Sequence, residues 1–413
     1  MNIGFFTDTY FPQISGVSTS ISILKAELES QGHQVTIFTT TDPNAAEDPT
    51  IVRLPSVPFI AFSDRRVAYR GFDKCLKIAQ EKQLDIIHTH TEFSLGLAGQ
   101  FVASRLDLPL VHTYHTMYER YTHYIADGLL IGPGQVKVLT KQFCSLASGV
   151  IVPSQLTYNT LKSYGVKTHM RVIPTGIPLN KFNTCSDNGY NETLKIKQDL
   201  GLDQGQTVYV SLSRLSKEKS IDVVIQAFKE IYQEDPNSAL VIVGDGPEKE
   251  NLELLSRSLL NKAIFFLGEV SHDQVGTYYR LGDVYLNASD SETQGLTYIE
   301  ALVNHVPVVA KENDYLKEVF TGQVNFGFLY QDVSEFKATA LKLVNSLRTE
   351  SLAPISDSQL YAISAEKFGA TVEAFYQDIL SDPKKYKNSL SHQVQNSMKR
   401  FIRELVLGSE QND

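Results

Sequence analysis

The run Val208-Tyr-Val-Ser-Leu-Ser213 is followed by a helical pattern over Ile221–Gln233 and then by Ala239-Leu-Val-Ile-Val243. Continuous apolar, β-branched runs of this length are typical of parallel strands that are buried on both faces. The alternation continues with strands predicted at Ala263–Leu267, Asp283–Ala288 and Val306–Ala310, and with helices at Glu248–Leu260 and Leu296–Asn304. This order predicts an α/β fold with a doubly wound parallel sheet.

The first half of the chain repeats the pattern. Strands are predicted at Asn2–Thr7, Val35–Thr39, Leu84–His88, Leu110–Thr113 and Gly149–Val152. The helix over Ser18–Gln31 ends before Gly32, and the polar stretch Asn180–Gly205 is predicted to be a linker. We therefore expect two doubly wound, Rossmann-like domains that face each other across a ligand-binding cleft.

Composition narrows the class of protein. A chain of 413 residues with 42% hydrophobic and 21% charged residues is globular and too long for one core. The net charge of −9, which arises entirely after residue 180, argues against nucleic acid as a partner. The three cysteines do not have the spacing of a metal site or form an even set for disulfides, which indicates a protein of the reducing cytosol. We expect no signal peptide and no membrane span, hence a protein that is soluble or sits on a membrane surface.

The most informative motif is Ser291-Glu292-Thr-Gln-Gly295-Leu-Thr-Tyr-Ile-Glu300, which follows a predicted strand and opens a helix. The amides around Gly295 and Leu296 would lie at a helix N-terminus, where an anion such as a diphosphate is favoured. Glu292 can hold sugar hydroxyls and Glu300 a ribose. The plainer alternative is an acidic first turn that complements the helix dipole.

Two further loops follow first strands of the predicted sheets. Arg214 and Lys219 follow the strand that ends at Ser213, where two cations would stabilise a departing nucleoside diphosphate. The alternative is a solvated basic loop. In the first half, Gly16 precedes a helix and would let the backbone approach a ligand closely, although a structural turn explains it equally well.

Histidines cluster after two strands of the first half, in His88-Thr-His90-Thr-Glu92 and His112-Thr-Tyr-His115. A zinc site is conceivable, but no cysteine or His-Glu-x-x-His spacing supports one. Hydrogen bonds to sugar hydroxyls, or purely structural roles, fit these histidines better. We therefore expect no metal site.

In order and spacing, these motifs resemble those of the family 4 retaining glycosyltransferases over nearly the whole chain. The matching segments are Ser15-Gly16-Val17, Val172-Ile-Pro-Thr-Gly-Ile177, Ser213-Arg214 with Lys219, Val243-Gly-Asp-Gly-Pro247, and the pair Glu292 and Glu300. The resemblance implies a GT-B fold, retention of anomeric configuration and no obligatory metal or other cofactor.

The resemblance also assigns roles. Arg214 and Lys219 match the diphosphate clamp, Glu292 the ligand of the donor hexose, and Glu300 the ribose ligand. Gly16 matches the glycine against the diphosphate. His115 matches the histidine near the reacting sugar, with His112 as the rival for that role.

The resemblance also orders the domains along the chain. We expect an N-terminal acceptor domain over 1–180, a nucleotide-sugar domain over 181–355, helices that cross back over 356–382, and a basic tail over 383–413.

A narrower resemblance is to the bacterial α-monoglucosyldiacylglycerol synthases. It rests on Phe5–Gln13, Pro55–Phe59, His88–Gly96 and His112–Tyr121. It implies UDP-glucose as donor, diacylglycerol as acceptor, and a peripheral position on the cytoplasmic face of the cell membrane. The sequence does not distinguish this activity from addition of a second hexose to the glycolipid, or from transfer to a soluble acceptor. It also does not distinguish glucose from galactose as the donor sugar. The complete set of clamp residues and carboxylates argues against a non-catalytic binding protein.

Residues 65–82 are predicted to form a basic amphipathic helix that docks on anionic lipid. Its apolar stripe would comprise Val67, Phe72, Leu76, Ile78 and Ala79, and its cations would include Arg65, Arg66, Arg70, Lys74 and Lys77. The alternative is an ordinary helix that covers the sheet and exposes a basic face.

Overall fold

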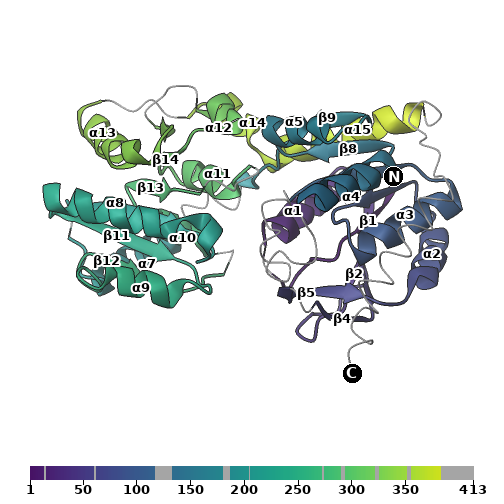
Figure 1. Ribbon diagram of the computed structural model, residues 1–413, viewed down its shortest axis with the longest axis horizontal. Helices are drawn as coiled ribbons and strands as arrows, with labels where there is room; N and C mark the ends of the chain where they lie inside the picture. The colour runs from purple at the N-terminus through teal and green to yellow at the C-terminus, as the bar shows by residue number, and fades with distance from the viewer. Residues whose placement is uncertain are drawn as a thin grey trace. The chain divides into compact units, whose positions relative to one another are not determined.

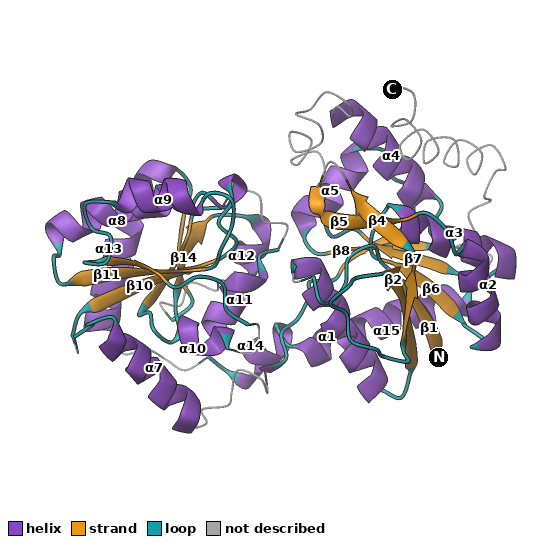
Figure 2. Ribbon diagram, turned by 90° about the horizontal axis from the view of Figure 1, so that it is seen from below, coloured by secondary structure: helices purple, strands orange, loops and turns teal. Residues whose placement is uncertain are grey.

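The computed structural model describes residues 1–13, 15–59, 62–116, 133–179, 187–203, 205–271, 274–289, 294–320, 325–350 and 355–382. The chain forms two compact units, one of Met1–Gly176 with the described segment that begins at Ala365, the other of Ile177–Ser364 (Figure 1). Each unit has its own parallel sheet with helices on both faces (Figure 2). The predicted pair of doubly wound α/β domains is confirmed.

The first unit is built on a seven-stranded sheet with the strand order β3-β2-β1-β6-β7-β8-β9. Its strands are β1 (Asn2–Phe6), β2 (Gln34–Thr40), β3 (Ile51–Leu54), β6 (Ile86–Thr89), β7 (Leu110–Thr113), β8 (Gly149–Val152) and β9 (Met170–Val172). Its helices are α1 (Gly16–Ser30), α2 (Phe72–Glu81), α3 (Ser94–Leu106), α4 (Pro133–Ser145), α5 (Gln155–Ser163) and α15 (Ala365–Ser381). A separate antiparallel hairpin comprises β4 (Ser56–Phe59) and β5 (Phe62–Ala68).

Consecutive residues of β1 show why this sheet is covered on both sides. Phe5 packs in a cluster with residues of α1 and α15, whereas Phe6 packs in a cluster with residues of α2 and α3. Both phenylalanines are fully buried. Because side chains alternate across a strand, an unbroken apolar run requires a helix layer on each face.

The second unit is built on a six-stranded parallel sheet with the order β12-β11-β10-β13-β14-β15. Its strands are β10 (Thr207–Leu212), β11 (Ser238–Val243), β12 (Ile264–Phe266), β13 (Val284–Asn287), β14 (Val308–Lys311) and β15 (Gly327–Tyr330). Its helices are α7 (Asp187–Asp199), α8 (Ile221–Glu234), α9 (Lys249–Ser256), α10 (Val275–Tyr279), α11 (Leu296–Val303), α12 (Asp314–Val319), α13 (Phe336–Thr349) and α14 (Asp357–Ala362). Two 3-10 turns are η3 (Lys217–Lys219) and η4 (Val333–Glu335).

The boundaries between the units differ from those predicted. The chain enters the second unit at Ile177 where residue 181 was expected, and it returns to the first at Ala365 where residue 356 was expected. The predicted linker contains a helix, α7, whose Ile196 packs against the core of the second unit, so polarity alone misjudged this stretch. Of the helices expected to cross back, only α15 joins the first unit, where it packs against α1 (Figure 1). The tail at 383–413 lies outside the described residues.

The prediction of one helix over residues 65–82 is wrong. Residues up to Ala68 belong to β5, and α2 begins only at Phe72, after Gly71 at φ +108° breaks the backbone direction. Leu76 and Ile78 on α2 pack against the core of the first unit, next to α3. The apolar stripe therefore faces the core. The solvent-exposed face of α2 carries Lys74 and Lys77 together with Asp73 and Glu81, and Lys77 Nζ lies 3.8 Å from Glu81 Oε1.

Candidate active site

Each sheet has a point where the strand order reverses, and the predicted motifs lie there. In the first sheet the reversal falls between β1 and β6, and in the second between β10 and β13. The segments of Gly16 and His90 follow β1 and β6, while those of Arg214 and Gly295 follow β10 and β13. In open α/β sheets, ligands bind beyond the carboxyl ends of the strands at this position. Each unit therefore carries its own candidate subsite.

The cationic loop of the second unit runs from Ser213 through η3. The Arg214 side chain is exposed and that of Lys219 is half-buried. Glu218 fixes the loop, because Ser216 Oγ donates to its carboxylate at 2.7 Å and Ser289 Oγ donates to its carbonyl at 3.0 Å. The second of these bonds joins the loop after β10 to the loop after β13. The two loops at the reversal point are thus held together.

The glycines of Val243-Gly-Asp-Gly-Pro247 have a packing role beneath the same loop. Gly244 adopts φ +137°, and a Cβ there would come within 1.9 Å of the Ser213 carbonyl oxygen. A Cβ on Gly246 would lie 2.3 Å from the Leu215 carbonyl oxygen. Only glycine permits this close approach of two backbones. This motif therefore packs directly against the backbone of the cationic loop.

The start of α11 is shaped by Gly295 and Glu300. Gly295 has φ +79°, and a Cβ there would lie 2.3 Å from the ring of Tyr298, so both its conformation and its surroundings require glycine. Leu296 is the first residue of the helix. Glu300 is buried, and Tyr279 Oη donates to its Oε2 at 3.0 Å. Burial raises the pKa of Glu300 to about 7, and the bond from Tyr279 opposes that shift. Glu292 lies outside the described residues.

The histidines His112 and His115 of the first unit differ in burial. His112 is fully buried on β7, and its ring nitrogens lie 3.0 Å from the Thr89 carbonyl oxygen and 3.2 Å from Glu92 Oε1. His115 lies beyond the end of β7, is only half-buried, and has its Nε2 3.1 Å from Nδ1 of His90. Burial and the neighbouring His112 lower the pKa of His115 to about 3, so this ring is neutral. Of the two rivals, His115 is the less buried.

His88 joins α15 to the sheet. Its Nδ1 lies 2.5 Å from Tyr376 Oη and its Nε2 lies 2.7 Å from Thr113 Oγ1. All three residues are buried. The histidine motif thus includes a structural member whose partner, Tyr376, the sequence pattern did not single out.

Asp8 fixes the loop that leads from β1 to Gly16. The buried carboxylate accepts hydrogen bonds from Thr91 Oγ1 at 2.6 Å, from Ser94 Oγ, and from the backbone N–H of Leu95 at 3.1 Å. Burial raises the pKa of Asp8, and these bonds oppose the shift. Gly16 itself is exposed, and a Cβ there would meet nothing within 4 Å. Packing within the described chain therefore does not require this glycine.

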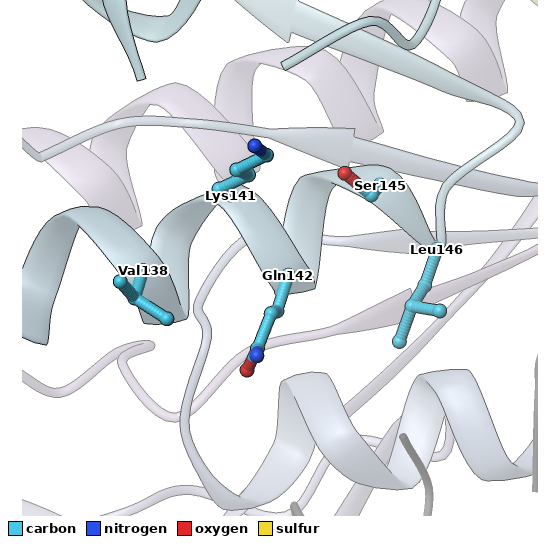
Figure 3. Close-up of a pocket in the computed structure, with 5 residues that line it drawn as sticks. All are labelled: Val138, Lys141, Gln142, Ser145 and Leu146. Carbon is cyan, nitrogen blue, oxygen red and sulfur yellow. The ribbon is translucent and has the colours of Figure 1, made fainter. Parts of the chain in front are cut away.

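The described residues offer few other candidate sites. Within the described part of the chain, no group of three or more histidine, cysteine or acidic side chains is placed to hold a metal ion. A shallow pocket is lined by Val138, Lys141, Gln142, Ser145 and Leu146 at the end of α4 (Figure 3). Because α4 leads into β8, this pocket lies at the amino ends of the strands, away from the reversal point.

The comparisons with known proteins agree with this architecture. The model of Glycosyltransferase Family 4 matches residues 14–181, and that of Glycosyl transferases group 1 matches residues 192–350. The chain is 47% identical, over 92% of its length and 86% of the relative's, to the alpha-monoglucosyldiacylglycerol synthase of Streptococcus pneumoniae. It is 36% identical, over 76% of its length and 81% of the relative's, to the enzyme of the same name from Acholeplasma laidlawii.

Solved structures show the same fold. The Anabaena protein HepE in complex with UDP superposes with a TM-score of 0.63 at 18% identity, over 98% of this chain and all of HepE. WaaG, a glycosyltransferase involved in lipopolysaccharide biosynthesis, superposes with a TM-score of 0.60 at 14% identity, over 95% of this chain and all of WaaG. Two parallel Rossmann-like sheets with polar motifs at their reversal points define a GT-B glycosyltransferase. This chain belongs to glycosyltransferase family 4, as its motifs indicated, and is a hexosyltransferase.

Proposed function

We propose that this enzyme transfers glucose from UDP-glucose to 1,2-diacylglycerol, with retention, giving α-monoglucosyldiacylglycerol. The observation that carries the proposal is the 47% identity to a relative of that name over nearly the whole chain. The site residues support it, because the cationic loop and the buried Glu300 both lie at the reversal point of the second sheet.

The second unit binds the donor in this proposal. Arg214 and Lys219 contact the diphosphate, together with the backbone amides at Gly295 and Leu296, where α11 begins. Glu300 accepts hydrogen bonds from the ribose hydroxyls. Glu292 precedes the same helix and holds hydroxyls of the glucose.

The chemical step breaks the bond from glucose C1 to the UDP oxygen and forms a bond from C1 to the acceptor oxygen on the same face of the sugar. The proton of the diacylglycerol hydroxyl passes to the departing phosphate. Negative charge on that phosphate grows during bond breaking, so Arg214 and Lys219 stabilise the transition state more than the bound substrate. In the first unit, the backbone at Gly16 approaches the diphosphate, and neutral His115 donates a hydrogen bond to the sugar.

The same residues remove the need for a metal. Two cations and a helix N-terminus supply the positive charge that a divalent ion provides in other nucleotide-sugar enzymes. We therefore propose that catalysis requires no bound metal or other cofactor.

The enzyme acts as a peripheral protein at the inner face of the cell membrane in this proposal. Tyr69 and the basic residues Arg70, Lys74 and Lys77 are exposed on and just before α2. Arg66 is occupied within the hairpin, because its guanidinium donates to Ser56 Oγ and to the Ser56 carbonyl. The side chain of Arg65 lies outside the described part of β5. Anionic lipids would thus be bound through charge, since the apolar face of α2 is already covered. No described helix is long and apolar enough to cross a bilayer.

The test is product identification. The purified protein is incubated with liposomes that contain diacylglycerol and an anionic phospholipid, and with UDP-glucose or UDP-galactose in parallel. The proposal expects glucosyldiacylglycerol with an α-anomeric proton, resolved by mass spectrometry and NMR. A parallel reaction uses liposomes that contain monoglucosyldiacylglycerol in place of diacylglycerol, so that transfer to the two acceptors can be compared. Transfer only to that glycolipid, or only from UDP-galactose, would overturn the proposal.

A further inference from the structure

His90 and His115 lie together beyond the ends of two adjacent strands. β6 and β7 pair in parallel, with Thr89 opposite His112, so both segments leave the sheet at the same edge. Nδ1 of His90 is 3.1 Å from Nε2 of His115. His115 is the histidine that the proposed function places at the donor sugar. His90 has so far been given no role.

The ring of His90 is held in one orientation. The residue is only 2% exposed. The ring of His88 lies 4.0 Å away between centroids, and the ring of Phe5 meets it edge-on at 4.8 Å. Packing on both of these neighbours aims Nδ1 at His115.

Protonation limits how the two rings can bond. Burial lowers the pKa of His90 well below its usual value and that of His115 to about 3, so both rings are neutral. A neutral imidazole has one N–H donor and one acceptor nitrogen. Either His115 donates from Nε2 to His90, or His90 donates from Nδ1 to His115.

Nε2 of His90 decides between these arrangements. This atom is buried and has no hydrogen-bond partner among the residues the structure describes. If His115 were the donor, the proton of His90 would sit on Nε2, as a buried N–H without an acceptor. If His90 is the donor, only a lone pair is left there. Buried N–H groups without an acceptor are the rarer and costlier case in proteins.

We propose that His90 is a positioning residue whose Nδ1–H donates to His115 Nε2 and so holds His115 as the tautomer protonated at Nδ1. His115 then offers a hydrogen-bond donor, and not a base, to its ligand. The catalytic part of this inference rests on the proposed function, in which His115 contacts the donor sugar. The tautomer itself does not depend on it.

The first experiment reads the tautomer without substrate. The full chain is labelled with ¹³C,¹⁵N-histidine, and the His115 signals are assigned by their loss in His115→Gln. Ring nitrogen and carbon shifts that mark an Nδ1–H tautomer of His115 are expected in the wild type. An Nε2–H tautomer would overturn the proposal, whatever reaction the enzyme catalyses.

The second experiment moves the donor by one position. The amide nitrogen of asparagine lies close to where Nδ1 of histidine lies, whereas that of glutamine lies close to Nε2. His90→Asn should retain turnover within a few-fold, and His90→Gln should lose about tenfold in kcat, the effect of one hydrogen bond, with a smaller change in KM. Only in His90→Gln should His115 change its tautomer.

The controls separate the inference from folding and from the proposed function. Thermal unfolding of both His90 variants is recorded, and kcat is compared for the folded fraction only. Equal kcat in the two variants, with His115 unchanged, would overturn the positioning role. If the wild type makes no glycolipid at all, the proposed function fails, while the NMR result still decides the tautomer.

Discussion

Replacing Tyr279 by phenylalanine removes the hydroxyl that donates to Glu300 Oε2 at 3.0 Å. That bond favours the ionised carboxylate, whereas burial, the larger effect, raises its pKa from 4.5 to about 7. A hydrogen bond to a charged group contributes about 1.5–3 kcal/mol, and one pKa unit corresponds to about 1.36 kcal/mol. Tyr279→Phe should therefore raise the pKa of Glu300 by a further ~1–2 units.

The consequence for binding follows from the charge of Glu300. As a carboxylate it accepts hydrogen bonds from ribose hydroxyls, so UDP affinity of the wild type should rise as pH increases through about 7. In Tyr279→Phe the same rise should need a pH higher by ~1–2 units. Isothermal titration calorimetry with UDP between about pH 6 and pH 9 measures the two profiles.

The consequence for stability has the opposite sign. The pKa of Glu300 is higher in the folded state than its reference value of 4.5. The protonated carboxyl therefore stabilises the fold fully below about pH 4.5, and this stabilisation is lost as pH rises through about 7. The difference between the two pKa values corresponds to about 3 kcal/mol. In Tyr279→Phe the loss should extend to higher pH, as chemical denaturation at several pH values would show.

Tyr285→Phe is the matched control, because Tyr285 is a buried neighbour whose hydroxyl donates to the Leu212 carbonyl at 3.1 Å. The profile of Tyr285→Phe also contains any change in affinity that comes from titration of UDP itself. If the affinity profile of Tyr279→Phe coincides with those of the wild type and Tyr285→Phe, Glu300 does not govern nucleotide binding and the reasoning is refuted.

The remaining predictions concern the clamp, metal, membrane and loop. Arg214→Ala and Lys219→Ala should each lower kcat by about 10²–10³ at saturating donor, since each removes a charge that stabilises the departing phosphate. EDTA should leave the initial rate unchanged, because fixed cations replace a metal. Each cation near an anionic surface contributes about 1 kcal/mol, so sedimentation with anionic liposomes should fall, at constant UDP affinity, when serine replaces Arg70, Lys74 and Lys77. Asp8→Ala should reduce the free energy of unfolding by about 3 kcal/mol in urea titrations, because it leaves buried donors without their acceptor.

Each of these predictions has a control. Lys217→Ala is the control because it removes an exposed cation from η3 itself. Equal rates in this control and in the two clamp variants would contradict the phosphate assignment. Activity that is lost in EDTA and returns with a divalent ion would establish a metal requirement. Serine substitutions of exposed lysines in the second unit, at Lys195 and Lys262, should leave liposome binding intact. Asp73→Ala, at an exposed position of α2, should leave stability unchanged, and an equal loss in both variants would refute the role of Asp8.

The sequence by itself determined the two doubly wound domains and the positions of the main motifs. Runs such as Ala239–Val243 have no polar face, and alternate residues of this run are buried on opposite sides of the sheet. Because loops after parallel strands meet at one edge, Arg214 and Gly295 had to lie near each other once β10 and β13 were neighbours.

Tertiary structure decided what each side chain in those loops contacts. The pattern His112-Thr-Tyr-His115 gives two equivalent candidates, and only burial shows His112 held between Thr89 and Glu92 while His115 lies beyond the strand. The basic amphipathic pattern of residues 65–82 was likewise compatible with a helix that docks on a membrane and with one that packs on the protein core. The left-handed backbone at Gly71 and the packing of Leu76 against the core settled its apolar face in favour of the core. Contacts between residues distant in sequence, such as Tyr376 with His88, depend on how whole elements pack, and no local pattern records them.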